Sequence, residues 1–176
     1  LAPDQRNWKE VIAERPEVIA QASVAGAGLF VGYLRDGVSR FYQFTPEGKE
    51  VREIPFPVPG TAVGFTGKWE DRQLFYYFTS YTYPSVKYLY DTATGRSTPF
   101  FPSRTPFDPT KYETKQLFYK SKDGTQVPLF LVYRRGLVKD GKRPVYLTGD
   151  GGFAVASGEV DGPFPVLDKT TTSSFP

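Results

Sequence analysis

The sequence predicts a mostly β protein that contains two four-stranded antiparallel sheets of the propeller-blade type. Three observations support this fold class. Short runs of aromatic and β-branched residues are separated by Gly, Pro and Asp turns, which is typical of antiparallel sheets. A set of such runs occurs twice along the chain, and only one short stretch has a helical pattern. The spacing of the two sets, roughly 40 to 50 residues, is that of a four-stranded blade.

The stretch with a helical pattern comes first. We predict a short helix over Asn7–Glu14, which ends at Arg15-Pro16 because the residue before a proline disfavours helical backbone. The triplet Gly26-Ala27-Gly28 is similar in composition to a dinucleotide-binding loop. It precedes a strand, however, whereas a phosphate-binding loop must open a helix. We therefore interpret the triplet as a turn between blades.

Two meanders come next. The first has turns at 35–37 and 46–48, and its predicted strands are Leu29–Leu34, Val38–Thr45 and Glu50–Ile54. The second has predicted strands at Gln73–Thr79, Val86–Asp91 and Arg96–Phe100. Aligning Gly48 with Gly95 superposes the two sets, so each set is interpreted as one blade.

Aromatic residues make up 16% of the chain, and their positions indicate what they do. Stacked rings can bind single-stranded nucleic acid or sugars. Most of the rings instead alternate along predicted strands, as Phe75 and Tyr77 do against Tyr76 and Phe78. Such alternation favours packing in the core or between adjacent blades, with the remaining rings at a tunnel or an exposed edge.

A proline-rich boundary separates the two blades from a second module. Pro102, Pro106 and Pro109 prevent regular pairing and predict a stiff extended linker. We therefore expect a two-blade segment over residues 1–105 and the second module over residues 106–160.

The second module is predicted to open with a hairpin. Its strands are Tyr112–Lys120 and Thr125–Tyr133, with Pro128 at an edge or a bulge. A short apolar strand, Val145–Thr148, then enters the glycine-rich loop Gly149–Gly152, the kind of place where α/β folds bind ligands. Residues 161–176 are rich in Pro, Thr and Ser and are predicted to be a mobile tail.

The chain contains no cysteine, histidine or methionine. Disulfides, thiol catalysis and an imidazole base are therefore excluded. Ser157 lacks the G-x-S-x-G context of a hydrolase nucleophile, and no spacing marks a Ser-Lys pair, so we predict no catalytic residue. Carboxylates such as Glu70-Asp71 have no His or Cys partner and are interpreted as solvated surface, so we predict no metal and no cofactor.

Charge and hydropathy exclude further classes of partner. The net charge is +3, and the basic residues are scattered rather than clustered along one segment, so we expect no nucleic-acid partner. No run approaches the roughly 18 apolar residues of a spanning helix, and the first residues lack a secretory pattern, so we expect no membrane partner. Because the chain starts at Leu1 and lacks Met, we expect it to be truncated, processed or edited.

A family resemblance rests on several segments whose order and spacing agree. They are residues 78–85, 112–116 and 121–130 with Gly136 and Gly141. Over roughly residues 7 to 153, the chain resembles an internal segment of the prolyl oligopeptidases.

The resemblance implies a fold and an activity. Residues up to about 100 would be the final blades of a propeller that filters peptides, and those from about 110 the β-rich N-terminal piece of an α/β-hydrolase domain. Family members cleave short proline-containing peptides after proline through a Ser-His-Asp triad, which this chain does not supply. The compartment stays open between cytoplasm and periplasm.

The resemblance also implies two site residues. The family has a Gly-Tyr-Gly-Gly-Phe turn, and here it reads Gly149-Asp150-Gly151-Gly152-Phe153. Phe153 would line the pocket for the substrate proline, while Asp150 stands where a tyrosine hydroxyl stabilises the oxyanion. A carboxylate cannot replace that donor, and loss of one donor costs about 2.7 to 4 kcal/mol of transition-state stabilisation.

We therefore expect no peptidase activity from this chain alone. Any activity would need the hydrolase portion that the chain lacks. The alternatives are a non-catalytic β module that binds a partner or associates with itself through open sheet edges, and an engineered chain whose fold departs from its parent.

Overall fold

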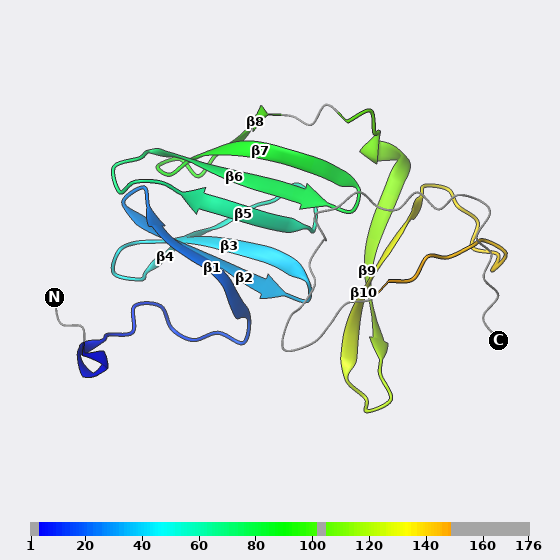
Figure 1. Ribbon diagram of the computed structural model, residues 1–176, viewed down its shortest axis with the longest axis horizontal. Helices are drawn as coiled ribbons and strands as arrows, with labels where there is room; N and C mark the ends of the chain where they lie inside the picture. The colour runs from blue at the N-terminus through cyan, green and yellow to red at the C-terminus, as the bar shows by residue number, and fades with distance from the viewer. Residues whose placement is uncertain (1–3, 102–104, 149–176) are drawn as a thin grey trace.

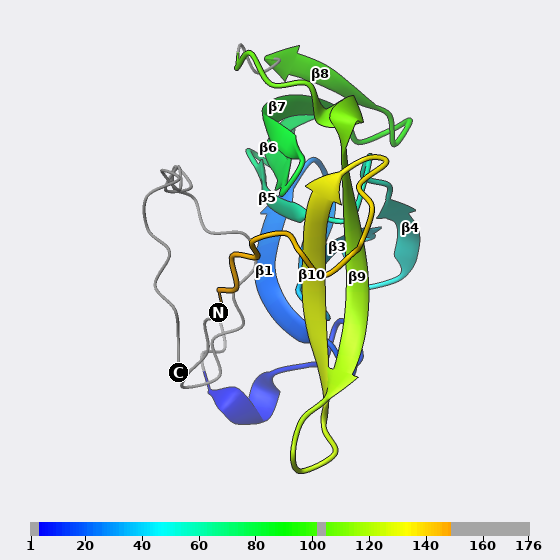
Figure 2. The same cartoon turned by 90° about the vertical axis from the view of Figure 1, so that its right-hand side faces the viewer.

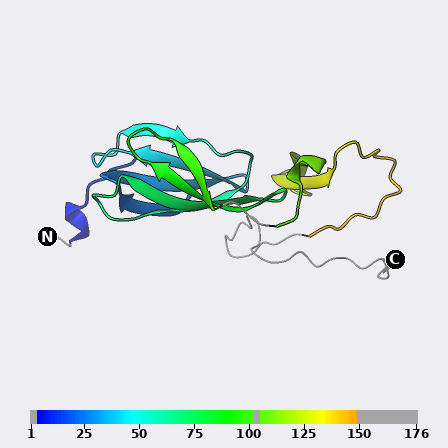
Figure 3. The ribbon, with the colours of Figure 1, turned by 90° about the horizontal axis from the view of Figure 1, so that it is seen from above.

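The computed structural model describes residues 4–101 and 105–148, and it consists mainly of β-sheet (Figure 1). Two four-stranded antiparallel sheets form the body, and a two-stranded hairpin lies at one end of them (Figure 3). Within each four-stranded sheet the strands pair in chain order, which confirms the prediction of two blades.

Each blade contains four strands. Blade 1 comprises β1 (Val18–Ala25), β2 (Gly28–Arg35), β3 (Val38–Phe44) and β4 (Glu50–Ile54). Blade 2 comprises β5 (Thr61–Thr66), β6 (Gln73–Ser80), β7 (Tyr83–Asp91) and β8 (Ser97–Phe101). The hairpin comprises β9 (Tyr112–Lys120) and β10 (Gln126–Arg134), and two short 3-10 helices are η1 (Gln5–Asn7) and η2 (Pro109–Lys111).

The first strand of each blade was missing from the predicted strands. β1 carries Gln21 and Ser23 at positions where an alternating strand would show apolar residues, and β5 is interrupted by Gly64. A bulge between Gly64 and Thr66 shifts the pairing of β5 with β6. These features interrupt the alternation of apolar and polar residues from which strands are predicted.

Aromatic side chains fill the space between the two blades. Phe65, fully buried, lies at the centre of this core, and its ring centroid lies 4.8 Å from that of Phe41 in blade 1 and 4.5 Å from that of Tyr76 in blade 2. Tyr76 and Phe78 point into the core, whereas Phe75 and Tyr77 on the same strand are exposed. The prediction that alternating rings pack between blades is therefore confirmed for Tyr76 and Phe78.

The bulge in β5 is what turns Phe65 into this core. Phe65 has a φ of 57°, an uncommon value for a residue with a side chain, and Gly64 has a φ of 128°, which favours glycine. Two side chains of β1 hold the bulge from blade 1. Gln21 hydrogen-bonds to both the backbone N–H and the carbonyl oxygen of Gly64, and the Ser23 hydroxyl donates to the Phe65 carbonyl oxygen at 2.7 Å. The blades are thus joined by backbone-directed hydrogen bonds as well as by ring packing.

The prediction of a helix over Asn7–Glu14 is wrong. The 3-10 helix η1 ends at Asn7, and residues 8–14 have no helical structure. In this irregular conformation Ile12 packs against an apolar cluster on blade 1 and Arg15 reaches the aromatic rings beside it. A two-turn helix is marginal by itself, so contacts with the sheet decide the conformation.

Two other expectations also differ from the structure. Gly26-Ala27 forms the turn between β1 and β2 inside blade 1, with φ values of 56° and 57°, and not a turn between blades. The strand predicted at Val145–Thr148 is absent, and Val145 and Leu147 are more than three-quarters exposed. A strand is stabilised by neighbours, and no strand in the described part of the chain pairs with these residues.

The hairpin prediction is confirmed. β9 and β10 pair over nine consecutive residues without a bulge, from Tyr112 opposite Arg134 to Lys120 opposite Gln126. Pro128 lies within β10 at an edge, as expected, because a two-stranded sheet consists of edges alone. Within residues 4–101 and 105–148, we find no helix with the length and hydropathy of a membrane-spanning segment.

Candidate functional site

The site residues expected from the sequence lie outside the described residues. These are Asp150 and Phe153, with their loop Gly149–Gly152 and the rejected nucleophile Ser157. The predicted tail over 161–176 lies outside them as well. The geometry of a candidate site must therefore be sought on the two blades and the hairpin.

Turns of both blades meet the hairpin along one rim of the body. This hairpin-side rim consists of the turn 36–37, the connection 55–60 between the blades and the turn 81–82. Viewed from that side, the hairpin crosses the ends of both sheets (Figure 2). The rim is therefore where the blade body faces the hairpin.

Hydrogen bonds and ring contacts among the described residues join the hairpin to this rim. The Gln116 side-chain amide donates to the Asp36 carbonyl oxygen at 2.7 Å, and the hydroxyls of Thr82 and Thr114 lie 3.3 Å apart. The rings of Tyr81 and Phe130 lie 5.4 Å apart between centroids. Phe130 also packs on Gly37, where a Cβ atom would lie 3.0 Å from its ring. The contacts are few and include both blades.

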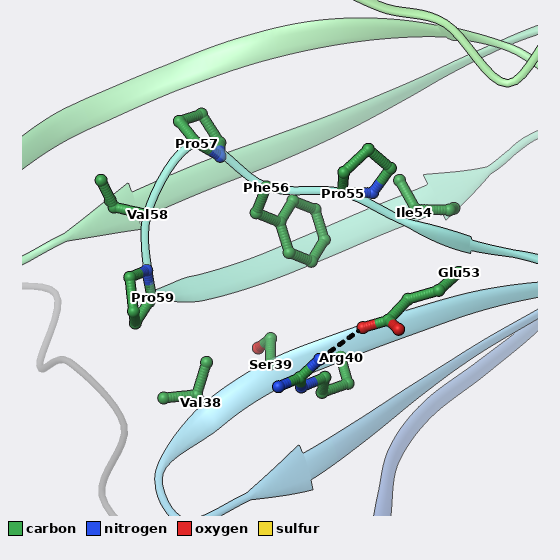
Figure 4. Close-up of a pocket in the computed structure, with 10 residues that line it drawn as sticks. All are labelled: Val38, Ser39, Arg40, Glu53, Ile54, Pro55, Phe56, Pro57, Val58 and Pro59. Carbon is green, nitrogen blue, oxygen red and sulfur yellow. Dashed lines mark hydrogen bonds and ion pairs between the residues drawn. The ribbon is translucent and has the colours of Figure 1, made fainter.

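A cavity of about 560 Å³ opens at the hairpin-side rim, between β3, β4 and the connection that follows β4 (Figure 4). The connection reads Pro55-Phe56-Pro57-Val58-Pro59. It bends at residues 57–59 and arches above the sheet, and its three prolines restrict its backbone (Figure 4). Phe56 turns back to pack on the core between the blades, where its ring stacks on that of Phe78 at 5.2 Å. The arch is thus anchored at its middle while its prolines line the cavity.

Charged side chains form the other wall of the cavity. Arg40 of β3 and Glu53 of β4 are joined by an ion pair, with 2.7 Å from Nη1 to Oε1. The hydrogen bond to Glu53 raises the pKa of the Arg40 guanidinium above its ordinary value. Both side chains are more than two-fifths exposed, so the pair adds little to stability and stays accessible to a ligand.

A second cavity of about 250 Å³ adjoins the first. It shares Val38, Arg40 and Pro59 with the larger cavity and extends to Asp36 and Gln116, which belong to the hairpin contact. The two cavities therefore form a continuous surface from the arch to the hairpin.

The described lining of this surface offers few kinds of chemical group. It holds no imidazole, because the chain contains no histidine. Among the described residues, no group of three or more Asp and Glu side chains is placed to hold a metal ion. What the cavity offers is an arch of prolines, one cation and one carboxylate.

Sequence reasoning missed the residues of this cavity. The alternation of three prolines over 55–59 was a signal that could have identified the arch. Arg40 and Glu53 carried no such signal, because they face each other only through the pairing of β3 with β4.

Comparison with known proteins supports the resemblance seen in the sequence. Residues 2–102 match the family model for the prolyl oligopeptidase N-terminal β-propeller domain. The chain is 37% identical over 154 residues to a prolyl endopeptidase of Elizabethkingia meningoseptica, an alignment that covers 88% of this chain and 22% of the relative. It is 26% identical over 163 residues to a macrocyclase-peptidase of Galerina marginata. The chain thus spans about a fifth of the length of these relatives.

Solved structures agree with this assignment. A structure from a study of two prolyl endopeptidases is 35% identical and has a TM-score of 0.72 over 77% of this chain and 20% of that chain. Prolyl oligopeptidase B from Galerina marginata, without ligand, has a TM-score of 0.64 at 22% identity over 73% of this chain and 19% of that chain, which supports the fold alone. The chain therefore belongs to the prolyl oligopeptidase family, of which it carries part of the β-propeller domain.

Proposed function

We propose that the chain supplies two propeller blades and the start of the α/β-hydrolase domain of a serine peptidase that cleaves short peptides after proline. The observation that carries this proposal is the family match over residues 2–102. Residues beyond that match add support, because the alignment with the Elizabethkingia relative is longer than the matched domain. The hairpin β9–β10 would then be the first part of the hydrolase domain.

The hairpin-side rim would face the peptidase half of such an enzyme. Its cavity lies beside the hairpin and exposes Arg40, Glu53 and the proline arch 55–59. A peptide on its way to the catalytic centre would pass such a surface. Glu53 would accept hydrogen bonds from the peptide's main-chain N–H groups, and Arg40 would bind its terminal carboxylate. The blades would act as a filter and the hydrolase domain would supply the chemistry.

For Phe153 and Asp150 we propose the roles that the family resemblance implies. Phe153 would line the pocket of the substrate proline, and Asp150 would stand where the family places an oxyanion donor. An ionised carboxylate there repels the developing negative charge and donates no hydrogen bond to it. We therefore propose that the chain has no peptidase activity of its own.

A chimera tests the proposal. Residues 7–153 replace the matching segment of the Elizabethkingia enzyme, which keeps its own triad, and cleavage of a chromogenic Gly-Pro substrate is measured. The chimera should cleave slowly, and Asp150→Tyr within it should raise kcat by about 10²- to 10³-fold, because a donor is restored. Asp140→Tyr, at an exposed position of the same module, is the matched control and should leave kcat unchanged.

Two results would contradict the proposal. One is a folded chimera that stays inactive after Asp150→Tyr. The other is turnover by the isolated chain that a serine reagent abolishes, since the chain would then catalyse without a histidine.

A second candidate function is self-association of the chain as a β module. The observation that favours it is the outer face of blade 2, where Phe75 and Tyr77 are 38% and 48% exposed and Phe100 is 51% exposed. Exposed aromatic faces of this kind are typical of interaction surfaces. Measurement of the oligomeric state distinguishes this candidate from a purely structural role within one longer polypeptide.

A further inference from the structure

A cation is held among three aromatic rings on the face of blade 1 that points away from blade 2. The Arg15 guanidinium carbon lies 5.0 Å from the ring centroid of Tyr33, 4.7 Å from that of Tyr42 and 5.6 Å from that of Phe44. One Nη atom also donates to the Glu50 carboxylate at 2.6 Å. The Arg15 guanidinium therefore makes cation–π contacts with the rings and a charged hydrogen bond to the carboxylate at the same time.

The rings and the carboxylate come from three adjacent strands. Tyr33 lies on β2, Tyr42 and Phe44 lie two residues apart on β3 and so share a face, and Glu50 opens β4 opposite Phe44. Tyr33 and Phe44 are each 2% exposed, and the rings of Tyr33 and Tyr42 are 5.8 Å apart in an edge-to-face arrangement. The sheet therefore presents these groups as a rigid set.

Arg15 itself belongs to no strand. It lies on residues 8–17, which we call the strap, an irregular segment that runs over blade 1 before β1 begins. Ile12 of the strap packs on the cluster of Val31, Tyr33 and Phe44 beside the guanidinium. Phe56, in the connection that leads into β5, packs on the core in a similar way, so each blade receives an apolar side chain from the segment that precedes it. Only the strap adds a cation to that contact.

We propose that Tyr33, Tyr42, Phe44 and Glu50 form a guanidinium-binding site on blade 1, which Arg15 of the same chain occupies and which takes arginine-type cations from solution when Arg15 is absent. Planar guanidinium cations are the ligand class, because they stack on rings and hydrogen-bond to a carboxylate at the same time. The site docks the strap, and this inference does not depend on the proposed peptidase function.

Chemical rescue of Arg15→Ala tests the site. The variant should lose about 5 °C of melting temperature, since the cation–π contacts and the ion pair are lost. Millimolar ethylguanidinium should restore most of this loss along a saturable curve. Ethylammonium should restore much less, because it lacks a planar face. Adding Glu50→Gln to Arg15→Ala should weaken ethylguanidinium binding about tenfold, because the charged hydrogen bond is removed.

Arg35→Ala is the matched control. Arg35 also pairs with the strap, at 3.7 Å from Glu17, but its guanidinium side chain is 59% exposed, against 28% for Arg15. Neither this variant nor the unaltered chain should gain stability from ethylguanidinium. An equal gain in all chains, or no gain in Arg15→Ala, would overturn the proposal.

A second measurement keeps the test decisive if Arg15→Ala does not fold. In the unaltered chain, ring currents should move the Arg15 Nε–Hε resonance upfield of the other arginines in a ¹⁵N-correlated spectrum. A resonance that coincides with those of the exposed arginines would show that the cage is empty in solution and would overturn the proposal.

Discussion

Gln43 is a buried polar side chain at the interface between the blades, and it links the two blades. The Tyr90 hydroxyl of blade 2 donates to Gln43 Oε1 at 2.7 Å, and Gln43 Nε2 donates to the Thr92 carbonyl oxygen at 2.9 Å. Both ends of the amide are therefore satisfied, as burial of a polar group requires. At the scale of single residues, this network selects one alignment of blade 1 against blade 2.

Replacement of Tyr90 tests the network. Tyr90→Phe keeps the ring but leaves Gln43 Oε1 buried without a donor, so we expect a loss of about 1 to 3 kcal/mol in the free energy of unfolding, measured by urea denaturation. Tyr33→Phe is the control, because the Tyr33 hydroxyl is buried without a hydrogen-bond partner among the described residues. Equal losses in both variants would contradict the role of Gln43.

The same variant changes the pH dependence of stability. Burial raises the pKa of Tyr90 from 10.0 to about 12. Because this folded-state pKa lies above the unfolded value, the neutral phenol contributes stability that is complete below pH 10.0 and lost as the pH rises toward 12. Tyr90→Phe should therefore flatten the fall in stability over this range, leaving the part due to Tyr88, Tyr76 and Tyr42, whose pKa values are also raised by burial.

Among the elements, the hairpin is the most independent. It pairs internally along its whole length, and among the described residues its contacts with the blades lie at the hairpin-side rim. Residues of β9 such as Phe118 and Tyr119 are about half exposed. An element with little buried surface opens at a lower free energy than the core does.

Removal of one ring should release the hairpin. Phe130→Ala removes the contacts with Tyr81 and Gly37, so we expect faster trypsin cleavage after Lys111 while the melting temperature of the blades stays nearly unchanged. Phe118→Ala, an exposed ring on the same hairpin, is the control and should cleave at the rate of the unaltered chain. A drop in melting temperature for Phe130→Ala as large as that of a core variant would show that hairpin and blades unfold together.

Among residues 4–101 and 105–148, the outer face of blade 1 is covered and that of blade 2 is open. The strap covers blade 1, whereas no described segment covers Phe75 and Tyr77 on blade 2, and Lys87 lies 4.3 Å from the Phe75 ring centroid. An exposed aromatic face of this kind favours association in water.

Light scattering against concentration tests this face. The chain should form dimers or larger species as concentration rises, and Phe75→Lys with Tyr77→Lys should shift it toward monomer, because two charges replace apolar surface. Trp8→Lys, which changes an exposed ring of the strap, is the control and should not alter the mass. A monomer at every concentration would exclude self-association.

Prediction from the sequence succeeded where local pattern was enough. Strands β2, β3 and β6 and the hairpin follow from alternation and turn residues, as in Gln73–Ser80. β7 was predicted only from Val86, because Pro84 was assigned to a connection, whereas the strand begins at Tyr83. It failed at the strap, where Ile12 and Arg15 take their conformation from partners on distant strands, and at β5, where the Gly64 bulge breaks the alternation. Of the candidate site, the proline arch over 55–59 left a trace in the sequence, whereas the Arg40–Glu53 pair did not.

A mostly β chain of repeated antiparallel sheets could be predicted from residue types alone, because they recur at the short spacings of strands and turns. The resemblance to prolyl oligopeptidases rests on separate segments such as residues 121–130. The entry of Phe65 into the core, the contact of Arg15 with three rings and the position of the rim cavity depend on the tertiary structure. These arrangements join side chains that are far apart along the chain. Their energies depend on distance in space, which no local pattern of residues encodes.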